Sequence, residues 1–257
     1  EGTRELVVVA QDTTYYGLDL YGEPRLAQLL AQLDQIQGIE WIRLMYAYPM
    51  YLTDELIELL AAGRKVLPYL DLPLQHVNDA VLRGMNRRVT RSETEQLLDR
   101  LRARIERLVL RTTMITGFPG ETDEQFEELL QFVQQRHFER LGAFVYSREP
   151  DTPSDQMRGH LPAKVAETRR DRLLAAQQEI AFAWNQAQVG RRLDVLIDRD
   201  IPDQPNAYVG RSYADAPEID GVVYVTGEDL APGQLVTCEI VASQEYDLVG
   251  VAVELPR

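Results

Sequence analysis

The segment Leu6–Gly22 reads LVVVAQDTTYYGLDLYG and places a long polar stretch directly after a short apolar run. The apolar run, Leu6–Ala10, is typical of a buried strand. A helical pattern begins after Pro24, with Leu26, Leu29, Leu30 and Leu33 on one face. Strand-to-helix connections usually have only a few residues. This one has about a dozen, rich in hydroxyl, amide and carboxylate groups, so we expect it to form part of an active site.

The same alternation of apolar run and helical pattern continues to about residue 160. Further apolar runs occupy residues 41–45, 66–70, 108–115 and 143–146. Repeated alternation predicts parallel strands joined by right-handed crossover helices, and therefore an α/β fold that is either a barrel or a doubly wound sheet. In both architectures ligands bind at the C-terminal ends of the strands.

Two helical patterns begin with the sequence signature of a capping box, in which Ser or Thr is followed three residues later by Glu or Gln. Ser92 with Glu95 is one such pair, and Thr122 with Gln125 is the other. Thr53 precedes acidic residues and a third apolar stripe. We therefore expect helices to begin at these three positions.

The last third of the chain has a different pattern. A long charged helical segment from about residue 164 to 188 is followed by short period-two segments at 193–197, 222–225, 235–241 and 248–253. Such segments, separated by Pro, Gly, Asn and Asp, predict a small all-β barrel. We therefore divide the chain into an α/β domain at 1–162, a linker helix at 163–188 and a β domain at 189–257.

Composition excludes several classes of protein. The chain of 257 residues is 45% hydrophobic and carries a net charge of -14. This charge argues against general nucleic-acid affinity, which depends on Lys and Arg. No apolar run approaches the ~20 residues of a membrane span. Cys238 is the single cysteine, so a disulfide framework is excluded and we expect a cytoplasmic protein with no metal site in this chain.

Polar residues follow each predicted strand and are candidates for ligand binding. Asp71 is either a general base or a cap of the following turn. Gly117-Phe118-Pro119-Gly120 is either a tight turn before a capped helix or a place where the backbone approaches a flat ligand. The remaining strand-end candidates include Gln11, Tyr46, Gln75, His76 and Tyr146.

Histidine and arginine positions also allow two interpretations. His76 has no second metal-ligating residue at suitable spacing, and His137 ends a helix, where a cation interacts favourably with the helix dipole. Arg83 and the segment Asn86-Arg87-Arg88 form a basic cluster in an acidic chain. The cluster either meets an anionic ligand, such as a carboxylate, or is a solvated helix end.

Together these segments resemble one family, the radical S-adenosylmethionine (SAM) methylthiotransferases. The matching strings are Gln11–Gly22 (QDTTYYGLDLYG), Tyr69–His76 (YLDLPLQH), Met85–Arg88 (MNRR) and Arg111–Glu121 (RTTMITGFPGE). The β domain resembles the TRAM domain of this family. Its string Gly210–Gly221 (GRSYADAPEIDG) is similar to the RimO type, which methylthiolates an aspartate of a small-subunit ribosomal protein near the decoding centre.

The resemblance implies an incomplete (βα)6 partial TIM barrel followed by a small OB-like TRAM barrel. It implies SAM across the strand ends, with the adenine near Ile115, Thr116, Gly117, Phe118 and Tyr146 and the methionine part near Gln11. Arg111 is then expected to pair with a carboxylate of the cofactor or of the substrate. The residues expected to contact the substrate are Tyr46, Asp71, Gln75, Arg87, Arg88, Arg211, Asp215 and Glu218. No catalytic residue is assigned.

The family also implies two [4Fe–4S] clusters, one of them held by a CxxxCxxC loop, which reductively cleaves SAM to a 5′-deoxyadenosyl radical. Neither set of cysteines is present in this sequence. Five strand runs are visible where the family has six, and the first strand with its cluster loop is the one without a counterpart. We therefore expect this polypeptide to be a C-terminal part that does not catalyse the reaction by itself.

The net charge of the β domain indicates which class of macromolecule the protein binds. Residues 189–257 contain five Arg and thirteen Asp and Glu, a net charge of −8. This charge repels a phosphate backbone and attracts a basic ribosomal protein, although acidic residues also simply favour solubility. We expect a basic protein substrate and no direct RNA binding. The alternatives are a transfer-RNA methylthiotransferase and a non-catalytic module that binds a ribosomal protein.

Overall fold

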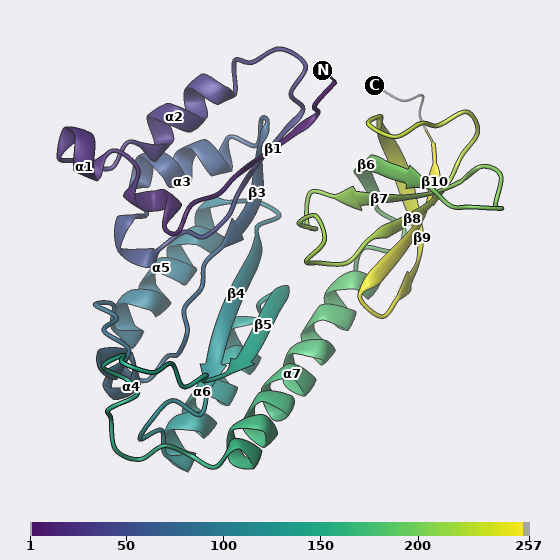
Figure 1. The fold of residues 1–257 in the computed structure, drawn as a ribbon. Coiled ribbons are helices and arrows are strands. Elements are labelled where there is room, and N and C mark those ends of the chain that lie inside the picture. Colours follow the sequence, from purple (N-terminus) through teal and green to yellow (C-terminus); the bar gives the residue numbers. More distant parts are fainter. Residues whose placement is uncertain (1, 254–257) are drawn as a thin grey trace.

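The computed structural model describes residues 2–253, which form a parallel sheet, a long helix and a closed β-barrel (Figure 1). The sheet has five strands in the order β1-β2-β3-β4-β5, and all neighbouring pairs are parallel. Their bounds are Glu5–Val8, Trp41–Leu44, Val66–Asp71, Val109–Thr116 and Arg140–Val145. Sequential order in a parallel sheet is the arrangement of an open half-barrel, so the predicted α/β fold is confirmed.

Helices cover one face of this sheet (Figure 1). One core joins Leu30, Leu60, Leu101 and Leu129 of these helices to strand residues such as Ile42, Leu44, Leu70 and Leu110. Because side chains alternate along a strand, the opposite face receives Arg43, Tyr69, Asp71 and Arg111. The helices are α1 Leu18–Tyr21, α2 Leu26–Leu33, α3 Asp54–Ala61, α4 Asp79–Gly84, α5 Arg91–Arg104 and α6 Asp123–Arg136.

Two of the three helix starts predicted from the sequence are confirmed by the structure. Thr53 caps α3, and Thr122 with Gln125 forms the capping box of α6. The predicted pair Ser92 and Glu95 is wrong, because the capping box of α5 is Thr90 with Glu93. Thr90 has the extended backbone that a cap needs, whereas Ser92 already lies in the first helical turn.

Helix α7, Ala163–Gln186, packs against β5 and α6 and leads into the β-barrel. The barrel is closed in the order β10-β8-β7-β6-β9, as the all-β pattern predicted. Its strands are β6 Arg192–Asp200, β7 Ala207–Ser212, β8 Val223–Thr226, β9 Leu235–Gln244 and β10 Asp247–Ala252. The sequence pattern did not predict β7, because almost all of its residues are buried and no alternation marks it.

A second apolar core joins the barrel to the sheet. Trp41, Met45, Tyr69 and Val109 of the sheet belong to the same buried cluster as Leu193 and other barrel residues. The parallel sheet and the β-barrel therefore share a buried core. The loop after β7 lies on the face of the sheet that carries the charged residues. No helix within residues 2–253 is both long enough and apolar enough to cross a membrane.

Candidate functional site

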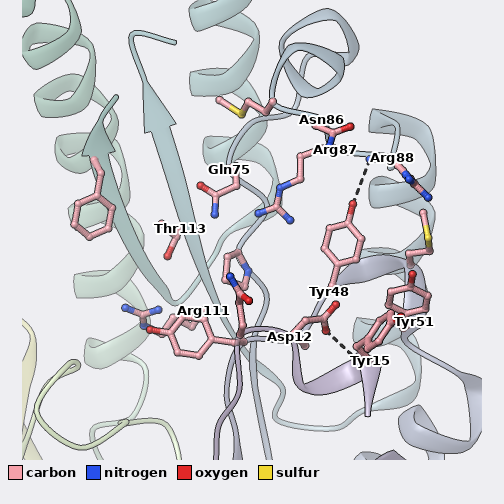
Figure 2. Close-up of a pocket in the computed structure, with 17 residues that line it drawn as sticks. Asp12, Tyr15, Tyr48, Tyr51, Gln75, Asn86, Arg87, Arg88, Arg111 and Thr113 are labelled. Atoms are coloured by element: carbon pink, nitrogen blue, oxygen red, sulfur yellow. Dashed lines mark hydrogen bonds between the residues drawn. The ribbon is translucent and has the colours of Figure 1, made fainter. Parts of the chain in front are cut away.

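A pocket of about 650 Å³ lies at the C-terminal ends of β1, β2 and β3 and continues along the charged face of β4 (Figure 2). This volume is within the range of small-molecule sites. The predicted strand-end placement of the site therefore agrees with the position of the pocket. Its lining is Gln11, Asp12, Tyr15, Tyr46, Ala47, Tyr48, Met50, Tyr51, Pro73, Gln75, Met85, Asn86, Arg87, Arg88, Arg111, Thr113 and Phe144.

The long loop after β1 is tied to the end of β2 by two buried threonines. The Thr13 hydroxyl donates to the Met45 carbonyl at 2.8 Å, and the Thr13 amide donates to the Tyr46 carbonyl at 3.0 Å. The Thr14 hydroxyl donates to Asp12 at 2.6 Å and accepts from the Tyr48 amide at 3.0 Å. These hydroxyls hold the loop in place, and Gln11, Asp12 and Tyr15 are left to line the pocket.

Three pocket residues that are not glycine have left-handed backbone, and two of them, Tyr46 with φ 54° and Gln75 with φ 71°, follow strands of the sheet; the third is Asn86 with φ 56°. This conformation costs free energy in such residues and is concentrated at functional sites. The Tyr46 amide donates to the Asp71 carboxylate at 3.0 Å, and the Gln75 amide donates to the Thr113 carbonyl at 2.8 Å. Neighbouring strands thus hold Tyr46 and Gln75 in the conformation that brings them to the pocket.

Aromatic rings form one wall of the pocket (Figure 2). Tyr15 and Tyr51 meet edge to face with centroids 5.7 Å apart, and Tyr48 lies 6.1 Å from Tyr51. The Tyr48 hydroxyl accepts from the Arg88 amide at 3.2 Å, and the Arg87 guanidinium lies 5.1 Å from the Tyr48 ring centroid. Within the described residues neither arginine forms an ion pair, so this side of the pocket is available to an anionic group.

Arg111 lies on the opposite side of the pocket and is already paired with two protein carboxylates. Its Nη1 is 2.9 Å from Asp71, and its Nε is 3.5 Å from Asp220, which belongs to the loop after β7. Asp71, expected as a general base, a turn cap or a substrate contact, is fully buried and outside the pocket lining, and its carboxylate accepts from Arg111 and from the Tyr46 amide. Burial favours a lower pKa for Arg111, but Asp71, Tyr69 and Asp220 raise the pKa overall, and the guanidinium stays charged.

The Gly117–Gly120 turn is packed against protein. A Cβ on Gly117 would lie 2.3 Å from Cβ of Ala166 in α7, so the close backbone approach that this glycine permits is to a helix. The Thr116 hydroxyl donates to the Ala166 carbonyl at 3.0 Å. Glu121 accepts from the Gly117 and Phe118 amides. Arg169 donates to Glu121 at 2.8 Å, so the turn, Glu121 and α7 form one buried unit.

The residues expected beside the adenine lie outside the pocket lining. Ile115, Thr116, Gly117, Phe118 and Tyr146 sit at the ends of β4 and β5, beyond Thr113 and Phe144. Phe118 and Tyr146 meet edge to face at 5.4 Å. The Tyr146 hydroxyl is buried with no hydrogen-bond partner among the described residues.

Three predicted substrate contacts, in the β7 strand and the loop after it, do not line the pocket. Arg211 is buried and pairs with Asp198 at 2.8 Å and with Glu5 at 2.5 Å. Asp215 is buried and pairs with Arg140 at 2.8 Å. Both residues therefore connect the barrel to the sheet, and their charges are balanced by protein partners. Glu218 is exposed in the same loop.

No cluster of three or more potential metal ligands is present in residues 2–253. His76 is buried, and desolvation lowers its pKa to about 4, with a smaller opposing effect of Glu128. Its Nδ1 accepts from the Asn78 amide at 3.0 Å. Cys238 is also buried, which raises its pKa to about 12 and leaves an unreactive thiol inside the barrel.

Sequence reasoning missed several pocket residues. Tyr15, Tyr48 and Tyr51 form the aromatic wall, and Thr113 and Phe144 line the strands. Tyr48 lies two residues after the predicted strand-end candidate Tyr46, so its position was a usable signal. Asp220 lies inside a matched family string, but no local pattern indicates that it reaches Arg111.

A half-barrel of parallel strands with a strand-end pocket, joined to a closed β-barrel, is the architecture expected of a radical SAM protein that carries a TRAM domain. The radical SAM superfamily model matches residues 1–133, and the TRAM domain model matches residues 189–253. The chain therefore belongs to the radical SAM superfamily.

Within this superfamily the chain is similar to ribosomal protein uS12 methylthiotransferase RimO. It is 50% identical to the Desulfitobacterium hafniense protein over 255 residues, which are 99% of this chain and 57% of that protein. It is 50% identical to the Symbiobacterium thermophilum protein over 256 residues, 98% of this chain and 53% of that protein. The chain thus spans little more than half the length of these relatives.

A solved structure with the same fold is that of coproporphyrinogen III oxidase (HemN) from Escherichia coli, described as a radical SAM enzyme. The TM-score is 0.55 with 17% sequence identity, over 82% of this chain and 55% of that one. At this identity the likeness supports the fold alone.

Proposed function

We propose that the chain is the SAM-binding and substrate-facing part of a methylthiotransferase that modifies an aspartate of ribosomal protein uS12. The observation that carries this proposal is the 50% identity to uS12 methylthiotransferases along 99% of the chain. The reaction replaces a C–H bond at the β-carbon of the aspartate with a C–SCH₃ bond.

The pocket supports SAM as the ligand. Its volume of about 650 Å³ suits a nucleoside with an amino-acid tail, and the Gln11 amide and Asp12 carboxylate offer hydrogen bonds to the tail. The Tyr146 hydroxyl has no hydrogen-bond partner among residues 2–253 and lies at the next strand end, which supports a nucleoside contact there, together with Ile115, Thr116, Gly117 and Phe118. One molecule of SAM would supply the radical that removes the hydrogen atom and a second would supply the methyl group, while the sulfur atom and the electron would come from outside this chain.

The residues of this chain do not fit an iron–sulfur cluster. Cys238 is the only cysteine, and it is buried in the β-barrel, away from the pocket. Thiolates normally hold such clusters, so we derive no step through a cluster from this chain. The two clusters of the proposed reaction would need ligands from outside this sequence.

On the substrate side, we propose that Arg87 and Arg88 meet the aspartate carboxylate. Both lie at the pocket without an ion-pair partner among the described residues, and arginine suits carboxylate recognition. Tyr46 and Gln75 would shape the space between this carboxylate and SAM. Arg111 is less suited to this role, because Asp71 and Asp220 already neutralise it.

The partner is proposed to be a basic protein. The exposed acids of the barrel include Asp200, Glu228, Asp229, Glu239 and Glu245, whereas its buried Arg211 is fully paired. Such a surface attracts a basic ribosomal protein and repels a phosphate backbone. A cytoplasmic location follows from this partner.

The test is mass spectrometry of uS12 from a strain lacking the gene that encodes this chain and from the same strain with the gene restored. The aspartate peptide should carry the methylthio group only when the gene is present. If uS12 is unmodified in both strains and a transfer-RNA adenosine loses its methylthio group instead, the chain belongs to a transfer-RNA enzyme. If neither changes, the non-catalytic binding module becomes the better hypothesis.

A further inference from the structure

We infer that Asp220 of the TRAM barrel is a positioning residue of the pocket and acts by holding the Arg111 guanidinium in place. This inference rests on the proposed function in one respect only, namely that the pocket binds SAM. It assigns a role in the site to a residue that lies in the other structural unit of the chain.

The contacts of Asp220 point to this role. Its Oδ1 is 3.5 Å from Nε of Arg111, while its Oδ2 accepts from the Tyr69 hydroxyl at 2.7 Å and from the Ala216 amide at 2.9 Å. Its side chain is only 5% exposed. The carboxylate is therefore held from two directions, and its remaining oxygen faces the guanidinium.

Arg111 is held on its other side by the sheet. Asp71 is its direct neighbour on β3, and the Asp71 carboxylate reaches Nη1 at 2.9 Å. The second oxygen of Asp71 accepts from the Tyr46 amide in the pocket wall. One carboxylate from each structural unit thus fixes the plane of the guanidinium, and a change at either carboxylate is transmitted to pocket residues.

The cavities on the two sides of Arg111 support the same conclusion. Arg111 lines the main pocket and also a second cavity of about 360 Å³, whose walls include Ile219, Asp220 and Gly221 of the TRAM barrel. The side chain therefore separates the pocket from the space between the two units. Without Asp220, only the Asp71 carboxylate would hold the Arg111 guanidinium, and the side that faces the second cavity would lose its partner.

The charges of Arg111 and its two carboxylate partners also affect which ligand the pocket prefers. The group formed by Arg111, Asp71 and Asp220 has a net charge of −1, and the two carboxylates reduce the repulsion between Arg111, which lines the pocket, and a cation such as the sulfonium of SAM. Removing the Asp220 charge would make the group neutral. The pocket should then discriminate less between SAM and its neutral thioether analogue S-adenosylhomocysteine.

The test compares the wild-type chain with Asp220→Asn, Asp220→Glu and the control Asp203→Asn, which removes an exposed carboxylate of the same barrel. The Nε–H signal of Arg111 in ¹H–¹⁵N spectra, assigned with Arg111→Lys, reports the ion pair directly. We expect Asp220→Asn to shift this signal and accelerate its solvent exchange, Asp220→Glu to restore it in part, and Asp203→Asn to leave it unchanged.

Equilibrium dialysis with SAM and S-adenosylhomocysteine gives the second measurement. We expect Asp220→Asn to weaken SAM binding roughly five-fold or more and to lower the preference for SAM over the thioether. An unchanged Arg111 signal overturns the inference, as does a lowered Tm with unchanged SAM affinity. If wild-type chain binds no SAM but the Arg111 signal responds to Asp220→Asn, the positioning contact stands and the proposed SAM site fails.

Discussion

Gly117 and Ala166 approach so closely that a Cβ on the glycine would lie 2.3 Å from the Cβ of the alanine. This contact joins the turn after β4 to helix α7, which in turn leads to the β-barrel. A glycine that the sequence associated with a ligand thus sets how the helix between the two units packs. The close contact between Gly117 and Ala166 predicts how substitution of the glycine changes the free energy of unfolding.

Gly117→Ala should lower the free energy of unfolding by roughly 3 kcal/mol, because φ of 79° strains any side chain and the new methyl group overlaps α7. Gly120→Ala is the matched control, since φ is 84° but nothing lies within 4 Å of the added Cβ. It should cost about 1 kcal/mol. Urea denaturation measures both. Equal losses at the two positions would contradict the packing argument.

His76 should make the protein less stable in mild acid. Burial lowers its pKa to about 4 from an ordinary value of 6.5, so the folded state favours the neutral ring. Above pH 6.5 the ring is neutral in both folded and unfolded chains, and no stability is lost. Between pH 6.5 and 4 only the unfolded chain takes up the proton, so stability falls by about 3 kcal/mol in total.

The measurement is the free energy of unfolding at several pH values for wild type and His76→Gln. The difference between the two curves should shrink as the pH falls through this window, because the variant lacks the titrating ring. Glu128 interacts with His76, and each group shifts the pKa of the other, so Glu128→Gln and the double variant are compared in the same way to separate the two titrations. Parallel curves would show that His76 does not titrate in this way.

Cys238 should react with thiol reagents only when the barrel opens. The side chain is fully buried, and its pKa is raised to about 12 by burial and then by Asp194. At pH 8 the native chain should be modified on the order of 1,000-fold more slowly than the urea-unfolded chain. Time-resolved labelling followed by mass spectrometry gives both rates. Rapid labelling without denaturant would be incompatible with the closed barrel.

We expect Glu5 to stabilise the connection between the parallel sheet and the β-barrel. It accepts from Arg43 at 2.8 Å and from Arg211 at 2.5 Å, and all three side chains are less than 10% exposed. Glu5→Gln leaves two buried guanidinium groups without that charge and should cost roughly 3 kcal/mol. Glu40→Gln, in the half-exposed pair with Arg4, should cost at most about 1 kcal/mol. Thermal unfolding of the two variants separates these effects, and similar losses would argue against a buried charge cluster.

Much of the fold was predictable because its signals are local. The five apolar runs correspond to β1–β5, the capping box at Thr122 was found, and the period-two segments indicated four of the five barrel strands. The error at Ser92 arose because two capping pairs compete within three residues, and only backbone conformation decides between them. The strand-end position of the pocket also followed from the sequence, since parallel strands place their C-terminal ends at one edge.

The ion-pair partners of the charged residues could not be predicted from local sequence patterns. Arg211 pairs with Glu5 across a sequence separation of 206 residues, and Arg140 pairs with Asp215 across 75. The sequence by itself determined the order of strands and helices, because periodicity and capping depend on neighbours within one or two turns. Only the tertiary structure decided that Arg111 meets Asp71 and Asp220, and that Gly117 faces Ala166, because ion pairs and close contacts depend on how distant segments pack.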